Sequence, residues 1–167
     1  MPVHHHPGRN GAVYRRQVRV RPRVLRGKAA VAQGKLAYQA FQQTFSGPRW
    51  DALAARGARV QRPLWASTST KNPAYPDTLY VDELIGPLTV NTLPDATLEA
   101  FADHGTLARR VDAEVDDAAA DWEAIAAAGV DLDDVAATLE REGVRSFQQS
   151  FDELLAALEA KAAELRG

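Results

Sequence analysis

The sequence predicts a parallel α/β fold, because short apolar runs alternate with helical patterns through its middle part. The apolar runs lie at residues 64–66 and 89–92, and each is followed by a polar loop and then by a helical pattern. In parallel α/β proteins such loops lie at the carboxyl ends of the strands, where ligands bind. The two loops are therefore the first place to look for function.

Composition limits the chain to one ordinary globular domain at most. It has 167 residues, of which 46% are hydrophobic and 25% are charged. It contains no cysteine, which excludes disulfides and thiolate nucleophiles, and which suits a reducing compartment, so we expect a cytoplasmic protein. No apolar run approaches the roughly 20 residues that span a bilayer, so we expect no membrane insertion.

Charge is distributed very unevenly along the chain. Residues 1–50 contain ten Lys and Arg and no acidic residue, so the net charge of -2 is +10 in this part and -12 in the remainder. We expect residues 1–26 to be a disordered basic leader and residues 27–167 to be the domain. Three explanations of this leader remain open: an accident of reading frame or start site, an arm that binds nucleic acid, and a transit peptide. We expect no closed metal site from His4, His5 and His6, because they are adjacent on the predicted leader.

Helices and strands are predicted in order from residue 28. The first helix spans residues 28–45, with Lys35 on its outer side; its apolar face contains Ala30, Leu36, Ala37, Phe41 and Phe45. A short helix at residues 50–56 ends at Gly57, and residues 64–66 form a buried strand. One or two helical turns follow at residues 78–85, then a strand at 89–92 and a helix that Asp95 caps.

Three more helical segments complete the prediction. An alanine-rich acidic helix spans residues 113–128, where the paired acids Asp116 and Asp117 form a solvated face. Asp131 caps a helix that Gly143 ends at residue 142. An amphipathic helix spans residues 147–165, and its apolar stripe indicates core or a surface for a partner helix rather than a ligand site.

The loop after the first strand carries four hydroxyl groups and a cation. Ser67, Thr68, Ser69 and Thr70 precede Lys71, and together these groups could hold a phosphate through hydrogen bonds and charge. The alternative is a turn that satisfies its own backbone, with Lys71 in solvent. Asn91 and Thr92 stand at the corresponding place after the second strand.

Residues 62–94, RPLWASTSTKNPAYPDTLYVDELIGPLTVNTLP, resemble the late-strand region of bacterial transaldolases. The resemblance is to the longer form found in actinobacteria and in fusions with glucose-6-phosphate isomerase. LRGKAAVAQGKLAYQAFQ resembles the preceding helix, and DDVAATLEREGVRSFQQSFDELLAALEAK resembles the closing helices. The resemblance implies a partial TIM (β/α)8 barrel, comprising the last two or three strand-helix units and the C-terminal helices.

The family resemblance also implies a chemistry. Transaldolases move a dihydroxyacetone unit between sugar phosphates of the fructose 6-phosphate class, in the pentose phosphate pathway. They use a lysine Schiff base and need no metal or organic cofactor. Their Schiff-base lysine lies in a segment resembling VKIPAT that this sequence lacks, so we expect a truncated, weak or inactive transferase with no catalytic residue of its own.

The resemblance assigns Ser67 and Lys71 to substrate phosphate. Two positions depart from the family pattern, since Ser69 stands where glycine is usual and Leu88 where an acid is usual. A partial barrel would also leave open strand edges, which favour self-association. The alternatives are a binding module with a basic nucleic-acid-binding N-terminal arm and a small helical scaffold.

Overall fold

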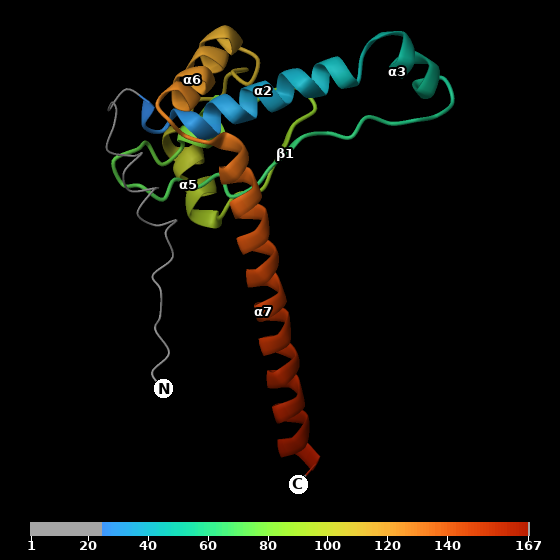
Figure 1. The fold of residues 1–167 in the computed structure, drawn as a ribbon, viewed down its shortest axis with the longest axis vertical. Coiled ribbons are helices and arrows are strands. Elements are labelled where there is room, and N and C mark those ends of the chain that lie inside the picture. Colours follow the sequence, from blue (N-terminus) through green and yellow to red (C-terminus); the bar gives the residue numbers. More distant parts are fainter. Residues whose placement is uncertain (1–24, 167) are drawn as a thin grey trace, which may run out of the picture. The chain divides into compact units, whose positions relative to one another are not determined.

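The computed structural model describes residues 25–166, which form two compact units that meet at residues 128 and 129. The elements of the first unit, in chain order (Figure 1), are α2 (Lys28–Thr44), α3 (Gly47–Ala54), β1 (Leu64–Trp65), α4 (Leu79–Glu83), β2 (Val90–Asn91), α5 (Asp95–His104) and α6 (Val115–Ala127). The predicted leader, residues 1–26, lies almost wholly outside the described residues.

The two predicted strands pair in parallel, with α4 in the connection between them. Leu64 lies opposite Val90 and Trp65 opposite Asn91. The Val90 amide donates to the Pro63 carbonyl at 2.9 Å, and the Thr92 amide donates to the Trp65 carbonyl at 3.0 Å. The alternation of strand and helix thus gives parallel pairing, as predicted. Within residues 25–166, β1 and β2 pair only with each other.

A small core lies behind this pair of strands. Tyr38, Leu84 and Val111 are buried together, and Phe41 and Trp65 pack against them. Trp65 Nε1 donates to the Leu84 carbonyl at 3.0 Å, which ties β1 to the end of α4. The core therefore joins α2, α4 and β1 around Val111, which has no exposed surface.

The buried face of α2 differs from the predicted one. Ala30 and Ala37, expected inside, are exposed, whereas Lys35, expected outside, is only 3% exposed. This face of α2 is buried because α2 lies along α6 (Figure 1), and the buried side of α2 includes Ala32 and Lys35. The predicted strand forms, but the prediction that it is buried was wrong. Leu64 is 54% exposed, on a strand that pairs with β2 alone among residues 25–166.

The predicted cap of α5 is not formed. Pro94 occupies the N-cap position, and no side chain there bonds to the backbone. Asp95 is instead the first residue of the helix, where its charge still meets the positive end of the helix dipole.

The second unit is one long helix, α7 (Leu132–Arg166). The Asp131 carboxylate accepts from the Asp134 amide at 3.0 Å, so the predicted cap is confirmed. The predicted stop at Gly143 is wrong, because the helix continues through it. A glycine inside a helix costs only about 1 kcal/mol relative to alanine, and the alanine, leucine and glutamate residues around it offset that cost.

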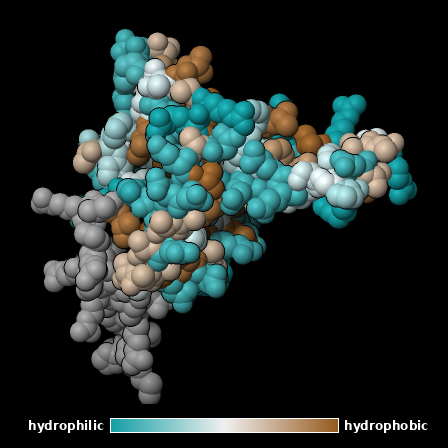
Figure 2. All heavy atoms as spheres, turned by 90° about the horizontal axis from the view of Figure 1, so that it is seen from above, coloured by the Kyte–Doolittle hydropathy of each residue, from teal (hydrophilic) through white to brown (hydrophobic). Residues whose placement is uncertain are grey.

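The surface of the first unit over α2 and α6 is mostly hydrophilic, with scattered hydrophobic spots (Figure 2). Among residues 25–166, no helix combines the length and the apolar character that a membrane crossing requires.

Candidate functional site

The two polar loops meet at the carboxyl ends of β1 and β2. The Thr68 hydroxyl donates to Asn91 Oδ1 at 2.8 Å and lies 3.5 Å from the Thr92 carbonyl oxygen. Thr68 is only 3% exposed, so this contact is shielded from water. The hydrogen bond joins residues 23 positions apart and ties the loop after β1 to the last residue of β2. The predicted edge of the sheet therefore exists as a structural feature.

Ser67 and Lys71 lie on the exposed side of the same loop. Lys71 Nζ donates to Ser69 Oγ at 2.6 Å, so the two side chains that flank Thr70 already contact each other. Ser67 has a φ of 58°, in the left-handed region that side chains disfavour, and so does Leu88 with 61°. The loop thus presents a cation and a hydroxyl to solvent from a strained backbone.

The loop after β1 is partly a local turn and partly a contact with β2. Asn72 forms a local turn, since its side-chain oxygen accepts from the Ala74 amide at 3.0 Å. Thr68, however, bonds to the Asn91 side chain at the end of β2 and not to its own backbone. Part of the loop is therefore a self-satisfied turn, and part of it builds the shared edge beside Ser67 and Lys71.

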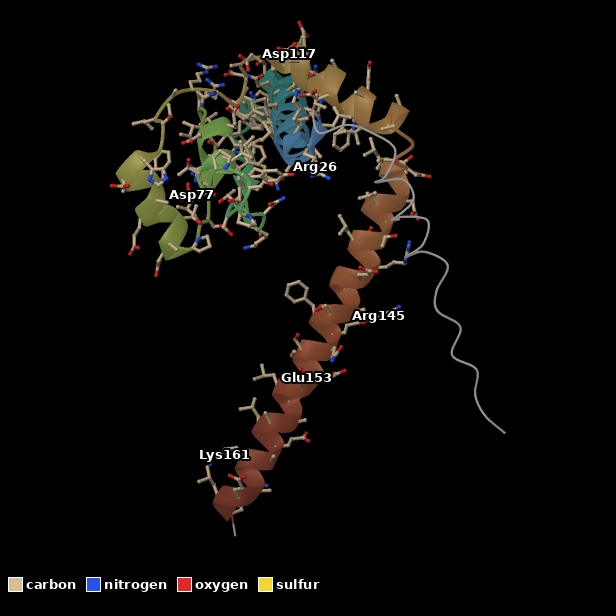
Figure 3. All side chains as sticks on the ribbon, turned by 90° about the vertical axis from the view of Figure 1, so that its left-hand side faces the viewer. Arg26, Asp77, Asp117, Arg145, Glu153 and Lys161 are labelled. Carbon is tan, nitrogen blue, oxygen red and sulfur yellow. The ribbon has the colours of Figure 1, made fainter. Side chains whose placement is uncertain are left out.

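One histidine and two aspartates hold the end of the loop that follows Lys71. His104 Nε2 lies 2.9 Å from Asp77, and Nδ1 lies 3.0 Å from Asp103. The hydrogen bond with Asp77, followed by that with Asp103, raises the pKa of His104 above its ordinary value. Asp77, labelled in Figure 3, comes from the loop after β1, whereas His104 is the last residue of α5. We call this set, Asp77, Asp103 and His104, the histidine clamp.

Two hydrogen bonds of Asp82 hold the chain segments beside the histidine clamp together. The Asp82 carboxylate accepts from the Thr78 hydroxyl at 2.7 Å and from the Thr106 amide at 2.8 Å. The start of α4 is thereby bonded to the segment that follows α5. Neither the histidine clamp nor the Asp82–Thr106 contact was predicted from the sequence, because the residues that they join lie 27 and 24 positions apart and carry no local signal of their proximity.

A buried ionic network lies under α2. Lys35 Nζ is 3.0 Å from a Glu83 carboxylate oxygen and donates to the Ala113 carbonyl at 3.2 Å. The other Glu83 oxygen lies 3.1 Å from Arg110 Nε. Burial alone would raise the pKa of Glu83, but Lys35 and then Arg110 outweigh it and lower that pKa. Lys35 lies three residues from both Ala32 and Tyr38, so these three residues share the buried side of α2.

A cavity of about 410 Å³ lies beside this network, between α2, α4 and α6. Two of its charged pairs are already satisfied, because Lys35 faces Glu83, and Lys28 Nζ lies 2.9 Å from Asp121. Asp117 also lines the cavity. Asp116 and Asp117 are both exposed to solvent, in agreement with the prediction that they form a solvated face. The cavity is thus lined mainly by groups that hold α2 against α6.

No three His, Cys, Asp or Glu side chains among residues 25–166 are grouped to hold a metal ion. His4, His5 and His6 lie outside the part of the chain that the structure describes, and so does most of the basic arm on which nucleic-acid binding would depend.

Comparison with known proteins gives a consistent picture. The family model described as Transaldolase/Fructose-6-phosphate aldolase matches residues 8–158, a range that begins inside the predicted leader. A transaldolase from Frankia alni is 54% identical over 134 residues, which cover 80% of this chain and 36% of that protein. A transaldolase from Thiobacillus denitrificans is 58% identical over 132 residues, with shares of 79% and 37%.

A third relative, a transaldolase from Acidothermus cellulolyticus, is 55% identical over 134 residues, which cover 80% of this chain and 36% of that protein. The chain thus spans a little over a third of the length of the curated relatives that it matches.

Proposed function

Because the chain belongs to the transaldolase/fructose-6-phosphate aldolase family, we propose that it supplies the phosphate-binding C-terminal part of a transaldolase. The family fold is a TIM barrel, and residues 27–167 correspond in this proposal to its last two or three strand-helix units and closing helices. The observation that carries the proposal is the Thr68–Asn91 hydrogen bond, which sets the loop of Ser67 and Lys71 at the carboxyl edge of two parallel strands.

In this role Lys71 supplies a positive charge and Ser67 a hydroxyl donor to the phosphate of a sugar phosphate. Lys71 is exposed and its present partner is one serine hydroxyl, so a phosphate dianion can replace that contact without leaving a buried charge. The full enzyme would transfer a dihydroxyacetone unit between sugar phosphates in the cytoplasmic pentose phosphate pathway, without a metal or organic cofactor.

The covalent step is assigned to a lysine outside this sequence. Forming a Schiff base requires a neutral amine that can reach the substrate ketone. Among the described lysines, Lys35 is buried against Glu83, and Lys71 is assigned to phosphate. Lys28 and Lys161 are paired with Asp121 and Glu164, which belong to α6 and α7 and not to the loop of Ser67 and Lys71. We therefore expect weak or no transferase activity from the isolated chain. The expected trapping result is no stoichiometric adduct by intact mass after incubation with fructose 6-phosphate and borohydride; an adduct at Lys71 would refute the phosphate assignment.

Calorimetric titration tests the phosphate role directly. Fructose 6-phosphate and inorganic phosphate should both bind, whereas fructose should not. Lys71→Met should weaken both affinities about tenfold, the equivalent of one charge-assisted hydrogen bond of about 1.4 kcal/mol. Lys161→Met is the matched control, because Lys161 is also an exposed lysine but lies on α7. Equal affinities for the two variants would remove Lys71 from the site.

The open edges of β1 and β2 add a second element to the proposal. Within the described residues, each strand has one partner and therefore one free edge. Unpaired amide and carbonyl groups at a sheet edge invite pairing with another chain. We expect this edge to promote self-association, or pairing with the earlier strands of a transaldolase, and sedimentation of the chain at increasing concentration would detect it.

A further inference from the structure

We propose that His104 is a positioning residue for the phosphate loop, by which we mean residues 67–77. In its protonated form, His104 holds Asp77 and thereby keeps Lys71 where it meets the phosphate of a sugar phosphate. The inference rests on the proposed function and adds control of the same site by protons. All the residues on which it depends belong to the first unit.

The contacts of His104 require a proton on both nitrogens of its ring. Nε2 lies 2.9 Å from Asp77, which Figure 3 labels, and Nδ1 lies 3.0 Å from Asp103. An ionised carboxylate can only accept a hydrogen bond, and a neutral imidazole has a single N–H to donate. Only the imidazolium form therefore satisfies both contacts at once. His104 also ends α5, where a cation meets the negative end of the helix dipole.

The charged groups around the ring favour its proton. Asp77 faces it from the loop after β1 and Asp103 from α5, and hydrogen bonds to these two raise the pKa of His104. On α4, the Asp82 carboxylate is engaged elsewhere, since it accepts from a hydroxyl and a backbone amide. The charged contact is complete below about pH 6.5 and is lost as the pH rises through the raised pKa.

The segment between Lys71 and Asp77 is stiff enough to carry a displacement from one residue to the other. The carbonyl and side-chain oxygens of Asn72 accept the amides of two of the next three residues, each at 3.0 Å. Pro73 and Pro76 have fixed φ angles. Few torsions are therefore left to absorb a movement of Asp77 before it reaches Lys71.

The other anchors of the phosphate loop do not titrate near neutral pH. Thr68 holds its start through the buried hydrogen bond to Asn91 at 2.8 Å. The Tyr75 ring packs against Gly27, where an added Cβ would meet the ring at 3.4 Å. Asp77 provides the only one of these three anchors that depends on the protonation of an imidazole. Loss of that proton should loosen one end of the loop and leave its start in place.

Backbone-amide NMR of the ligand-free chain tests the link between His104 and Lys71. Between about pH 5 and pH 9, the Lys71 amide signal should shift with the same midpoint as the His104 ring. Asp77→Ala should abolish this shift. Asp103→Asn is the matched control, because it removes the ring contact that lies within α5, and the Lys71 signal should still follow the ring. A Lys71 amide that is indifferent to the titration of His104 would overturn the proposal.

Calorimetric titration with inorganic phosphate tests the effect on binding. At about pH 6 the wild type should bind about threefold to fivefold more tightly than His104→Asn, a modest ratio because the His104 and Asp77 side chains are 50% and 63% exposed and water screens their contact. At about pH 8.5 the two affinities should converge. Phosphate itself titrates in this range, but its ionisation is common to both proteins and cancels in the ratio.

Asp77→Ala separates positioning from direct charge. Removing a carboxylate near a phosphate would strengthen binding by charge alone, whereas loss of positioning should weaken it at about pH 6. Tighter binding by Asp77→Ala, or equal affinities of His104→Asn and wild type at about pH 6, would overturn the role of His104 and leave the phosphate site standing. Absence of phosphate binding by the wild type would overturn the proposed function, and this role with it.

Discussion

Replacing Glu83 by methionine should destabilise the first unit more than replacing Lys35 by methionine, although the two residues form one ion pair. The two substitutions differ in the charged group that each one leaves without its partner. Without Glu83, the Lys35 ammonium keeps only the Ala113 carbonyl, and its side chain is 4% exposed. Without Lys35, Glu83 still faces Arg110 at 3.1 Å, and its side chain is 22% exposed.

The magnitudes follow from these environments. Removing one partner of a buried pair typically costs about 3–5 kcal/mol, because the remaining charge is uncompensated. We expect about 3–4 kcal/mol for Glu83→Met, which strands a buried cation, and about 1–2 kcal/mol for Lys35→Met, which leaves a partly solvated, paired carboxylate. The double substitution should cost about 2 kcal/mol less than the sum, since it strands neither partner of the pair.

Urea unfolding followed by tryptophan fluorescence measures these differences. All three tryptophans, Trp50, Trp65 and Trp122, belong to the first unit, so the signal excludes α7. Lys28→Met is the control, because the Lys28–Asp121 pair lies on the same helix but is 44% exposed at the lysine, and its loss should cost less than about 1 kcal/mol. A Lys35→Met cost equal to or above that of Glu83→Met, or strictly additive costs, would show that the buried Lys35 charge does not depend on Glu83 in this way.

Three further predictions concern the loops, the clamp and α7. Thr68→Val should cost about 1–3 kcal/mol, because it removes a buried donor from Asn91, whereas Thr68→Ser should keep the hydrogen bond; urea unfolding separates them. His104 has a pKa raised above 6.5, so its contribution is complete below about pH 6.5 and is lost as the pH rises through the raised value. Asp77 has a pKa lowered below 3.8, so its contribution is lost only as the pH falls through that lowered value. The unfolding midpoint of wild type should therefore exceed that of His104→Asn most at about pH 5–6, and the difference should shrink in alkaline solution; a difference independent of pH would contradict this. Gly143→Ala meets nothing within 4 Å and should raise helix stability by up to about 1 kcal/mol; unchanged or reduced thermal stability of the far-ultraviolet dichroism would contradict it.

The parts of the fold that local signals determine were predictable from the sequence. The apolar runs at residues 64–66 and 89–92 predicted the parallel pair, and the polar loops after them predicted the edge where Thr68 and Asn91 meet. Asp131 was recognisable as a cap because capping depends on residues three positions apart. Family membership was predictable from residues 62–94, and the comparisons confirm it.

Other features depend on contacts between distant residues and had no local signal. Lys35 is buried because α6 and Glu83 lie over that side of α2, and a helix with alanines on several sides does not show which face is covered. The histidine clamp joins residues 77 and 104, which only the folded chain brings together. Gly143 was misread as a stop because a single unfavourable residue was weighed without the 35-residue helix around it.

A domain substitution tests whether this chain can supply the phosphate-binding part of a transaldolase. Residues 27–167 of this chain would replace the part of the Frankia alni transaldolase that they match, and transfer between fructose 6-phosphate and an aldose phosphate would be measured. The hybrid should be active, with kcat within about tenfold of the parent, and Lys71→Met should raise its KM about tenfold while Lys161→Met leaves it unchanged. A folded hybrid without transferase activity, or an active one indifferent to Lys71→Met, would contradict the assignment of this chain to the phosphate-binding part of a transaldolase.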